Sequence, residues 1–412
     1  MSPAQRRNLF IILILGALST ISPFAIDMYL PAFGQIAADM NTVPSTVALS
    51  LSSYFIGLAA GQLAYGPLLD RYGRKRPLYA GLTLFVFASI GCMTSHTVES
   101  LIIWRFFQAL GGCVAQVAAT AMVHDFFPVK ESAKIFSLLI LILGVSPLLA
   151  PTVGGFVTTS LGWHWVFILL AGIVLVIMGI VHMFLPEGHQ PDTTISLKPR
   201  PIVHSFLLIL KEPQFYTHAL AGALSFAGLF AYVAGSPIIF MNIFSVSPQM
   251  YGGIFAMLSV GFIGGSQLNI WLTRKFGSAR IFLVALICQT VIGGIFMIGA
   301  YNGWYGLYAT LACLFMFLPC IGIGYPNAAA LALAPFSKNA GSASALLGFI
   351  QIGMGAVASC GVGMFHAPTL FTIVLLMCGW AGLALLALLV ARRNIDPRHA
   401  VEVEAAAAPV MH

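Results

Sequence analysis

Two ionisable side chains of fixed sign, Asp27 and Arg105, lie deep inside long apolar stretches of this sequence. An isolated charge within a bilayer costs about 2.5 kcal/mol or more, so such a residue is usually paired or faces a water-filled cavity. Counted inward from Phe33 and Val98 along a helix, both side chains lie roughly 10 Å deep in the outer half of the bilayer. Opposite charges at matched depth predict a proton-coupling or substrate site; the alternative is a structural ion pair that fixes helix packing.

A polar stripe follows Arg105 along the same stretch. Gln108, Gly112 and Gln116 stand three, seven and eleven residues after it, which is the period of one helical face. We expect this face to line a substrate cavity or to contact another helix.

The second half of the chain offers only uncharged polar groups at comparable places. Between Pro213 and Ala391 there is no Asp or Glu, so carboxylate proton chemistry is expected only in the first half. Tyr232, Ser236 and Tyr325 are candidates for the substrate cavity, although each such residue taken alone is more often a helix–helix hydrogen bond. The 31 Phe and 16 Met residues would suit an apolar or aromatic solute.

The elements that must position these residues are membrane-spanning helices. Of the 412 residues, 59% are hydrophobic and only 8% are charged, whereas soluble proteins carry about 25% charged residues. A span needs about 20 apolar residues. The sequence therefore predicts an all-α membrane protein with twelve spans. They cover residues 9–33, 45–68, 77–95, 98–123, 134–159, 163–185, 214–241, 249–272, 280–300, 305–333, 340–365 and 369–391.

The placement of lysine and arginine predicts the orientation of these spans, because cytoplasmic loops are enriched in both. All of the 19 Lys and Arg residues except Arg105 fall before the first span, in the even-numbered loops, or after the last span. Both termini are therefore expected in the cytoplasm, and the chain is expected to cross the bacterial cytoplasmic (inner) membrane many times. The net charge of +7 belongs to this pattern, so no nucleic-acid partner is expected.

A polar, proline-containing segment near the middle divides the chain into two sets of six spans. The predicted organisation is an N-terminal six-helix bundle (1–185), a cytoplasmic linker (186–212), a C-terminal six-helix bundle (213–391) and a cytoplasmic tail (392–412). Within the linker, residues 202–210 predict a short amphipathic helix on the membrane surface. Two pseudo-symmetric bundles are the layout of a transporter with its site near the membrane midplane.

A weak internal repeat supports the two-bundle organisation. LLDRYGRKRPL after the second span matches WLTRKFGSARIFL after the eighth span, with Gly73 aligned to Gly277. The two halves are therefore expected to be parallel repeats.

The loop after the second span, GPLLDRYGRK, resembles the signature loop of the major facilitator superfamily, GxLxDRxGRK. Its glycines permit a tight turn, and its carboxylate can face a helix N-terminus. Arg71 or Arg74 can reach Asp125 at the inner end of the fourth span. The resemblance implies a conformational latch that holds the two halves together, with the candidate residues Gly66, Asp70, Arg71, Gly73, Arg74 and Asp125.

Two further motifs are similar to signatures of the same family. LIIWRFFQALGG resembles the fourth-span motif LxxxRxxQG, with Ala109 in place of the usual glycine. SPLLAPTVGG resembles the fifth-span motif of proton-driven exporters, GxxxGPxxGG, with Ser146 and Ala150 in place of glycines. By its residues alone the second motif predicts a kinked, closely packed helix. Its candidate residues are Pro147, Pro151, Gly154 and Gly155.

The segment IDMYLPAF, which contains Asp27, narrows the resemblance. Together with SPLLAPTVGG it is similar to the Bcr/CflA subfamily of drug-resistance transporters, across nearly the whole chain. Members export compounds such as bicyclomycin, phenicols and sulfonamides in exchange for protons. The resemblance implies that Asp27 is the proton-coupling carboxylate and that Arg105 is its partner arginine.

The predicted function is therefore proton-coupled efflux of small apolar or aromatic antibiotics by alternating access. An exporter of a sugar or amino acid with the same fold is the alternative. An enzyme is not expected, because HExxH and a deep Ser–His or Asp–Asp pair are absent. The seven cysteines lie in apolar runs without metal spacing, so no metal or cofactor is expected. The expected partners are drug substrates, protons and the lipid bilayer, and the expected state is a monomer.

Overall fold

The computed structural model describes residues 3–127, 129–188, 191–192, 199–336, 340–365 and 368–394. Over these residues every regular element is helical, and twelve helical segments are long and apolar enough to cross a membrane. This confirms the predicted fold class and the predicted number of spans. Residues 189–190 and 193–198 of the predicted linker, and residues 395–412 of the predicted tail, lie outside the described residues.

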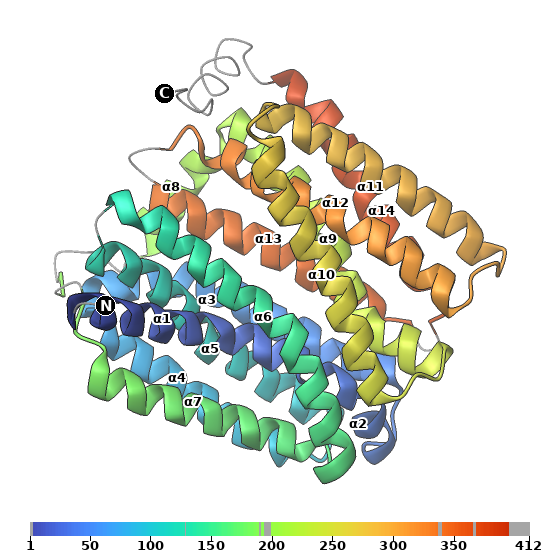
Figure 1. Ribbon diagram of the computed structural model, residues 1–412, viewed down its shortest axis with the longest axis horizontal. Coiled ribbons are helices and arrows are strands. Elements are labelled where there is room, and N and C mark those ends of the chain that lie inside the picture. The colour runs from blue at the N-terminus through green and yellow to red at the C-terminus, as the bar shows by residue number, and fades with distance from the viewer. Residues whose placement is uncertain are drawn as a thin grey trace. The chain divides into compact units, whose positions relative to one another are not determined.

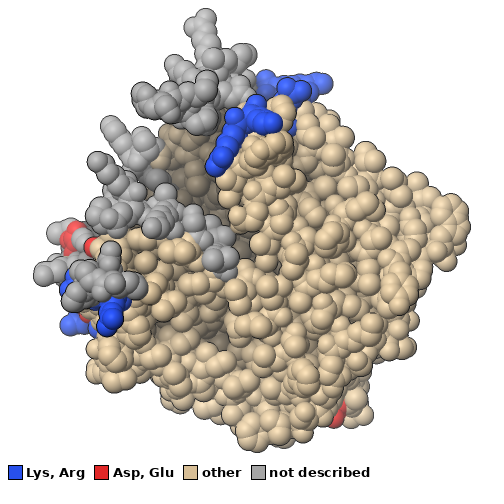
Figure 2. Space-filling model, in the orientation of Figure 1, with Lys and Arg blue, Asp and Glu red and all other residues tan. Residues whose placement is uncertain are grey.

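The chain divides into two compact units, which are described separately. Unit 1 comprises Met1–Lys198 with Ser247–Ala256, and unit 2 comprises Pro199–Val246 with Met257–His412. Many large apolar side chains are exposed on both units; Val176 and Leu386 are 63% and 58% exposed. The face drawn in Figure 2 is almost entirely uncharged, with Lys and Arg gathered near helix ends. Such a surface suits surrounding lipid, because a soluble protein does not expose continuous apolar area of this kind.

Unit 1 is built around α5. This helix packs against α1, α3 and α4, while α6 packs against α1 and α7 packs against α4. The long helices of this unit, coloured dark blue to green, run alongside one another in Figure 1. The elements are α1 (Pro3–Asp27), the 3₁₀ turn η1 (Leu30–Ala32), α2 (Phe33–Asp39), α3 (Pro44–Tyr72), α4 (Lys75–Met93), α5 (Val98–Phe126), α6 (Val129–Leu161) and α7 (His164–Phe184).

The first span differs from the continuous stretch expected over residues 9–33. Helix α1 ends at Asp27, and the chain continues through η1 into α2, so the apolar segment reaches Asp39. Pro31 provides the physical reason, because a proline ring clashes with the carbonyl four residues earlier, which here belongs to Asp27. The carboxylate expected near the outer end of a helix therefore lies at a helix break.

Helix α2 is fastened to the start of α7 by one tryptophan. The backbone N–H of Trp163 donates to Gln35 Oε1 at 2.9 Å, and its indole Nε1 donates to Asp39 Oδ2 at 2.7 Å. These bonds fix the chain that follows the break in the first span.

Unit 2 is built around α9. This helix packs against α12, α13 and α14, and α11 packs against α12 and α14. The linker helix α8 rests on this unit through Phe206 and Ile209, which join a cluster with Phe215. The elements are α8 (Pro199–Leu210), α9 (Pro213–Pro237), the π-helical turn η2 (Ile238–Ile243), α10 (Pro248–Leu272), α11 (Ser278–Tyr301), α12 (Leu307–Leu333), α13 (Ala340–Gly363), α14 (Leu370–Ala391) and the 3₁₀ turn η3 (Arg392–Asn394).

Candidate functional site

The Arg105 guanidinium occupies a fully buried position in unit 1. Its Nη1 donates to Gln108 Oε1 at 2.6 Å and to the backbone carbonyl of Ala25 at 3.2 Å. Its Cζ also lies 4.1 Å and 4.5 Å from the ring centroids of Tyr54 and Tyr29. A desolvated cation over aromatic faces gains about 2 kcal/mol per favourable pair, which offsets part of the cost of burying it.

The break in the first span provides a reason why a cation is stable at the position of Arg105. Ala25 lies in the last turn of α1, where carbonyl groups lack a following helical turn and carry the negative end of the helix dipole. Arg105 supplies a donor to that turn from α5. Its Nε and Nη2 have no hydrogen-bond partner among the described residues. A buried charged group with unused donors is costly, by about 1–3 kcal/mol or more, so a ligand, a water or a moving side chain would be stabilised there.

Asp27 is buried, with 7% of its surface exposed, and it is the residue at which α1 ends. Within the described residues the ion pairs join Arg74 to Asp70 and Asp125, and none joins Asp27 to Arg105. The two predicted partners are nevertheless brought to the same turn, because Arg105 is bound to the carbonyl two residues before Asp27.

One residue of the polar stripe on α5, Gln108, is bound to Arg105. Gln108 is fully buried, and its Nε2 also donates to Ser89 Oγ of α4 at 2.7 Å. Gly112 lies against α4 and α1, since a Cβ atom there would lie 3.0 Å from the Phe85 ring and 3.2 Å from Ser22 Oγ. Gln116, one turn further on, is half-buried.

The exporter-like motif of α6 lies against the turn that follows Asp27. A Cβ atom at Gly154 would lie 2.2 Å from the Met28 carbonyl oxygen, so only glycine permits this approach of α6 to the chain. Pro151 and Gly155 are also buried and Pro147 is half-buried, and both prolines lie within α6. The structure thus joins two separately predicted features, the motif of the fifth span and the carboxylate of the first.

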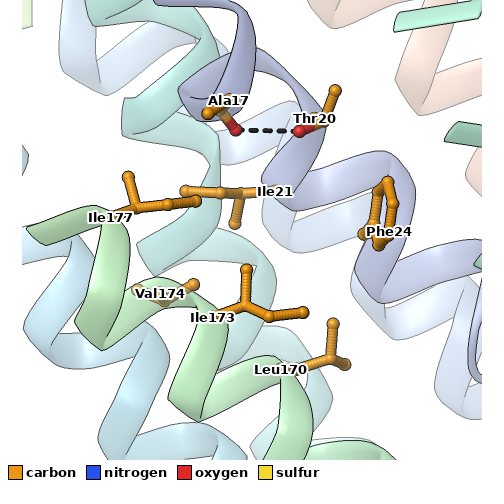
Figure 3. A pocket seen from close by; sticks show the side chains of 8 residues that line it. All are labelled: Ala17, Thr20, Ile21, Phe24, Leu170, Ile173, Val174 and Ile177. Carbon is orange, nitrogen blue, oxygen red and sulfur yellow. Dashed lines mark hydrogen bonds between the residues drawn. The ribbon is translucent and has the colours of Figure 1, made fainter. Parts of the chain in front are cut away.

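An apolar pocket of about 160 Å³ opens between α1 and α7 (Figure 3). Its only polar lining residue, Thr20, donates its hydroxyl to the Ala17 carbonyl at 2.8 Å. Neither Asp27 nor Arg105 lines it, so this pocket is not the candidate site.

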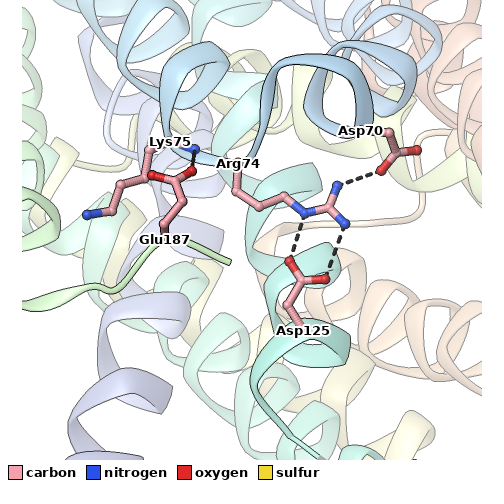
Figure 4. Close-up of polar contacts among 5 residues, drawn as sticks. All are labelled: Asp70, Arg74, Lys75, Asp125 and Glu187. Atoms are coloured by element: carbon pink, nitrogen blue, oxygen red, sulfur yellow. Dashed lines mark hydrogen bonds and ion pairs between the residues drawn. The ribbon is translucent and has the colours of Figure 1, made fainter. Parts of the chain in front are cut away.

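Three of the candidate latch residues, Asp70, Arg74 and Asp125, are joined through Arg74 near the end of α3 (Figure 4). Arg74 Nε donates to Asp125 Oδ2 at 2.8 Å, Nη2 donates to Asp125 Oδ1 at 3.2 Å, and Nη1 donates to Asp70 Oδ1 at 2.6 Å. Burial alone would lower the pKa of the Arg74 guanidinium, but its bonds to Asp125 and Asp70 outweigh this and hold the pKa above its ordinary value. Of the two arginines that could reach Asp125, Arg74 makes these bonds, while the Arg71 Cζ lies 5.8 Å from the Tyr72 ring centroid.

Gly73 and the start of the predicted linker lie next to these residues in the chain or in space. Helix α3 ends at Tyr72, and the next residue, Gly73, has a φ of 81° that is favourable only for glycine, whereas Gly66 has open space around it. After α7, Glu187 Oε1 accepts from the Lys75 backbone N–H at 3.2 Å at the start of α4. A carboxylate is favoured at that position by the helix dipole.

Two contacts between buried polar side chains of unit 2 are neutral pairs. Ser225 Oγ donates to Gln289 Oε1 at 2.6 Å between α9 and α11. Asn327 Nδ2 donates to Asn269 Oδ1 at 2.6 Å between α12 and α10. Each pair ties two helices together without a charge, as interhelical hydrogen bonds commonly do in membranes.

Tyr325 is the candidate of unit 2 with the richest surroundings. Its hydroxyl donates to Gln351 Oε1, and its ring lies 4.7 Å from that of Phe226, which also faces Phe230 and Phe262. The other two candidates of this unit, Tyr232 and Ser236, are buried on α9, where the Ser236 hydroxyl donates to the Val233 carbonyl at 3.0 Å.

Several residues of these sites were not among the sequence-based candidates. Tyr29 and Tyr54 flank Arg105, Ser89 accepts from Gln108, and Glu187 reaches the latch. Tyr29 stands two residues before Pro31, so the proline was a usable signal for the break; the other contacts join distant segments and leave no local signal. No cluster of metal-binding side chains occurs within the described residues.

Comparisons with known proteins agree with this architecture. The Major Facilitator Superfamily sequence model matches residues 15–359. The chain is 30% identical to a bicyclomycin resistance protein homolog of Haemophilus influenzae, over 90% of this chain and 94% of the relative. It is 29% identical to the multidrug resistance protein MdtL of Escherichia coli, over 88% and 93% of the two chains. Among solved structures, a D-xylose–proton symporter matches with a TM-score of 0.74 at 16% identity, covering 94% of this chain and 98% of that one.

Proposed function

The chain belongs to the Major Facilitator Superfamily, and from that premise we propose that it exports small, uncharged apolar or aromatic antibiotics in exchange for protons. Membership of this family and the names of the relatives confirm the predicted resemblance to drug-resistance transporters of the Bcr/CflA type. The protein is a multi-pass transporter of the bacterial inner membrane rather than an enzyme.

Drug efflux is supported by relatives that span nearly the whole chain and are named for resistance to bicyclomycin and to multiple drugs. The solved relatives of low identity support the fold alone. Bicyclomycin and chloramphenicol are therefore the first substrates to test on this chain.

Asp27 is proposed to carry the coupling proton. A carboxylate without a cation partner is costly to hold in apolar surroundings, and binding a proton removes that cost. In the proposed cycle Asp27 takes a proton from the acidic outside, alternating access carries it across, and the proton is released inside as substrate binds. One proton moving down a potential of 100 mV supplies about 2.3 kcal/mol, enough to raise an uncharged drug by more than about tenfold.

The observation that carries this proposal is the pair of unused Arg105 donors at the turn that contains Asp27. These donors are placed to stabilise a carboxylate once its proton has left, if the turn or α5 shifts. The same donors are open to a substrate oxygen. Arg105 would thereby link the charge of Asp27 to the conformation of α1 and α5.

The latch and the α6 motif are proposed to support the cycle in different ways. The Arg74–Asp125–Asp70 cluster would stabilise the conformation in which the cavity faces outward. Gly154 would keep α6 close enough to the Asp27 turn for the two to move together.

Drug-tolerance and vesicle transport assays test the proposal. Cells lacking their own pumps should gain tolerance to bicyclomycin or chloramphenicol when they produce this protein, and inverted vesicles should take up the drug in response to a proton gradient. Asp27→Asn should abolish gradient-driven uptake, whereas Glu99→Gln, which removes an exposed acid of α5, should not. Intact gradient-driven uptake by Asp27→Asn would show that another group couples the proton. Uptake of a sugar or amino acid in place of both drugs would support a metabolite exporter.

A further inference from the structure

The loops after the second and eighth spans stand at equivalent places in the internal repeat but carry different charges. With Gly73 aligned to Gly277, Arg274 takes the place of Asp70, and Ser278 takes the place of Arg74. The second loop therefore lacks both the acid and the arginine on which the latch of unit 1 depends.

In unit 1 the cations of this loop have acidic neighbours within the same unit. Arg74 is bound by Asp125 and Asp70, and Glu187 accepts a hydrogen bond from the backbone of Lys75. The counter-charges of this loop are thus part of the protein.

In unit 2 three cations surround the end of α10 and the start of α11. Arg274, Lys275 and Arg280 are all exposed, and none forms an ion pair in the part of the chain that the structure describes. The sequence provides no Asp or Glu between Pro213 and Ala391. Figure 2 shows blue side chains, with no red ones beside them, over this end of α10 and α11. The negative charge that balances these three cations must therefore come from outside the helices of unit 2.

Two exposed aromatic side chains lie among the cations. Trp271 is 51% exposed and Phe276 is 42% exposed. Lys275 Nζ lies 4.2 Å from the Trp271 ring centroid, and Arg280 Cζ lies 5.5 Å from the Phe276 ring centroid. Exposed aromatic rings at the end of a membrane span are typical of the headgroup level of a bilayer. Rings at that level would hold the neighbouring cations at the depth of the lipid phosphates.

We propose that Trp271, Arg274, Lys275, Phe276 and Arg280 form a binding surface for the headgroups of anionic glycerophospholipids. The phosphates would accept hydrogen bonds from the two guanidinium groups and the ammonium group, while the rings lie at the boundary of the acyl chains. Basic clusters next to membrane helices recognise anionic lipids in this way, and the predicted cytoplasmic orientation of this loop places it at the more negative leaflet. Lipid thus supplies in unit 2 the counter-charge that carboxylates supply in unit 1.

Native mass spectrometry of the full-length protein in detergent tests this surface. The protein is titrated with phosphatidylglycerol or phosphatidylcholine of the same acyl chains, and bound lipid is counted. The test variant is Arg274→Gln/Lys275→Gln/Arg280→Gln. The control variant is Arg6→Gln/Arg7→Gln/Lys211→Gln, which loses the same charge from other exposed positions. A third variant ends at Asn394 and so lacks the acids of the tail.

We expect the wild-type protein and the control variant to prefer phosphatidylglycerol, and the test variant to lose roughly tenfold or more of that preference, because each surface cation contributes roughly fivefold. The preference should weaken with salt and persist with added inorganic phosphate, which would compete if a free anion were the ligand. Trp271→Leu/Phe276→Leu should lower binding of both lipids without abolishing the preference. Equal preference in the test and control variants would overturn the proposal, as would a large gain in binding on removal of the tail.

Discussion

The two units differ in the charge of their buried polar groups. Unit 1 buries a guanidinium, Arg105, beside a turn that ends in a carboxylate, Asp27, and leaves two donors of the guanidinium unused. Unit 2 pairs neutral groups such as Ser225 with Gln289, and its helices contain no acid between Pro213 and Ala391. Neutral pairs are satisfied in one arrangement, whereas a charge with unused donors gains from a second arrangement.

This difference suggests that the two units, although they share one layout, have different roles in transport. Unit 1 is suited to respond to proton binding, because a proton changes the charge of its buried network. Unit 2 offers aromatic and amide groups, which suit recognition of an uncharged solute. The contrast predicts that equivalent disruptions in the two units will have unequal effects on transport.

The largest difference is expected between Arg105→Gln and Gln289→Leu. Arg105→Gln removes a buried charge together with its hydrogen bonds to the Ala25 carbonyl and Gln108, and a hydrogen bond to a charged group contributes about 1.5–3 kcal/mol. Transport per molecule should fall by about a hundredfold or more. Gln289→Leu breaks only a neutral pair, at about 1–3 kcal/mol, and should mainly lower the melting temperature. Vesicle uptake normalised to protein amount measures both, and equal losses would remove the distinction between the units.

A smaller effect is expected at the latch. Asp70→Asn keeps the shape of the side chain but removes the charge that Arg74 binds at 2.6 Å. Drug uptake should fall by roughly tenfold while drug binding is retained, because charge-assisted bonds of this kind contribute about 1.5–3 kcal/mol. Arg76→Gln, which changes an exposed cation in the first turn of α4, is the matched control. Unimpaired uptake by Asp70→Asn would exclude the latch role.

A packing test probes the link between α6 and the Asp27 turn. In Gly154→Ala the added methyl group meets the Met28 carbonyl oxygen at 2.2 Å, so the turn or α6 must shift. We expect gradient-driven uptake to fall by about fivefold, with overpacking of this kind costing about 1–3 kcal/mol. Gly264→Ala on α10 adds the same methyl group where no atom lies within 4 Å. Comparable losses in both variants would show that the effect is not specific to the Asp27 turn.

The smallest effect is expected in unit 2. Tyr325→Phe keeps the ring contact with Phe226 but removes the hydrogen bond to Gln351. The KM for an aromatic drug should rise by about two- to threefold with little change in kcat, because one neutral hydrogen bond contributes about 0.5–1.5 kcal/mol. Measuring uptake over a range of drug concentrations separates the two constants. A large fall in kcat at unchanged KM would instead assign Tyr325 to the transport step.

Much of the fold could be predicted from the sequence, because hydrophobic length identifies membrane spans. The twelve stretches, the helical character of residues 202–210 and the reach of Arg74 to Asp125 all appear in the structure. The spans and the short helix depend on local composition, which a sequence displays directly. The contact of Arg74 with Asp125 depends on the number of spans between them, which places both residues at the same membrane face.

The detailed geometry of the site could not be predicted in the same way. Matched depth suggested that Arg105 would pair with Asp27, but depth along two helices does not specify which atoms face each other. The break at Asp27 creates free carbonyl groups, and Arg105 binds one of these at Ala25. The approach of Gly154 to Met28 likewise joins segments far apart in the chain, so only the structure brings them together.

Proton release on drug binding tests most directly whether proton exchange takes place in unit 1 at Asp27. Purified protein in weakly buffered detergent is mixed with a drug that it exports, and a pH-sensitive dye records the released protons. The wild-type protein and Tyr325→Phe should release protons as the drug binds, whereas Asp27→Asn should bind the drug without release. Undiminished release by Asp27→Asn would show that Asp27 does not carry the exchanged proton.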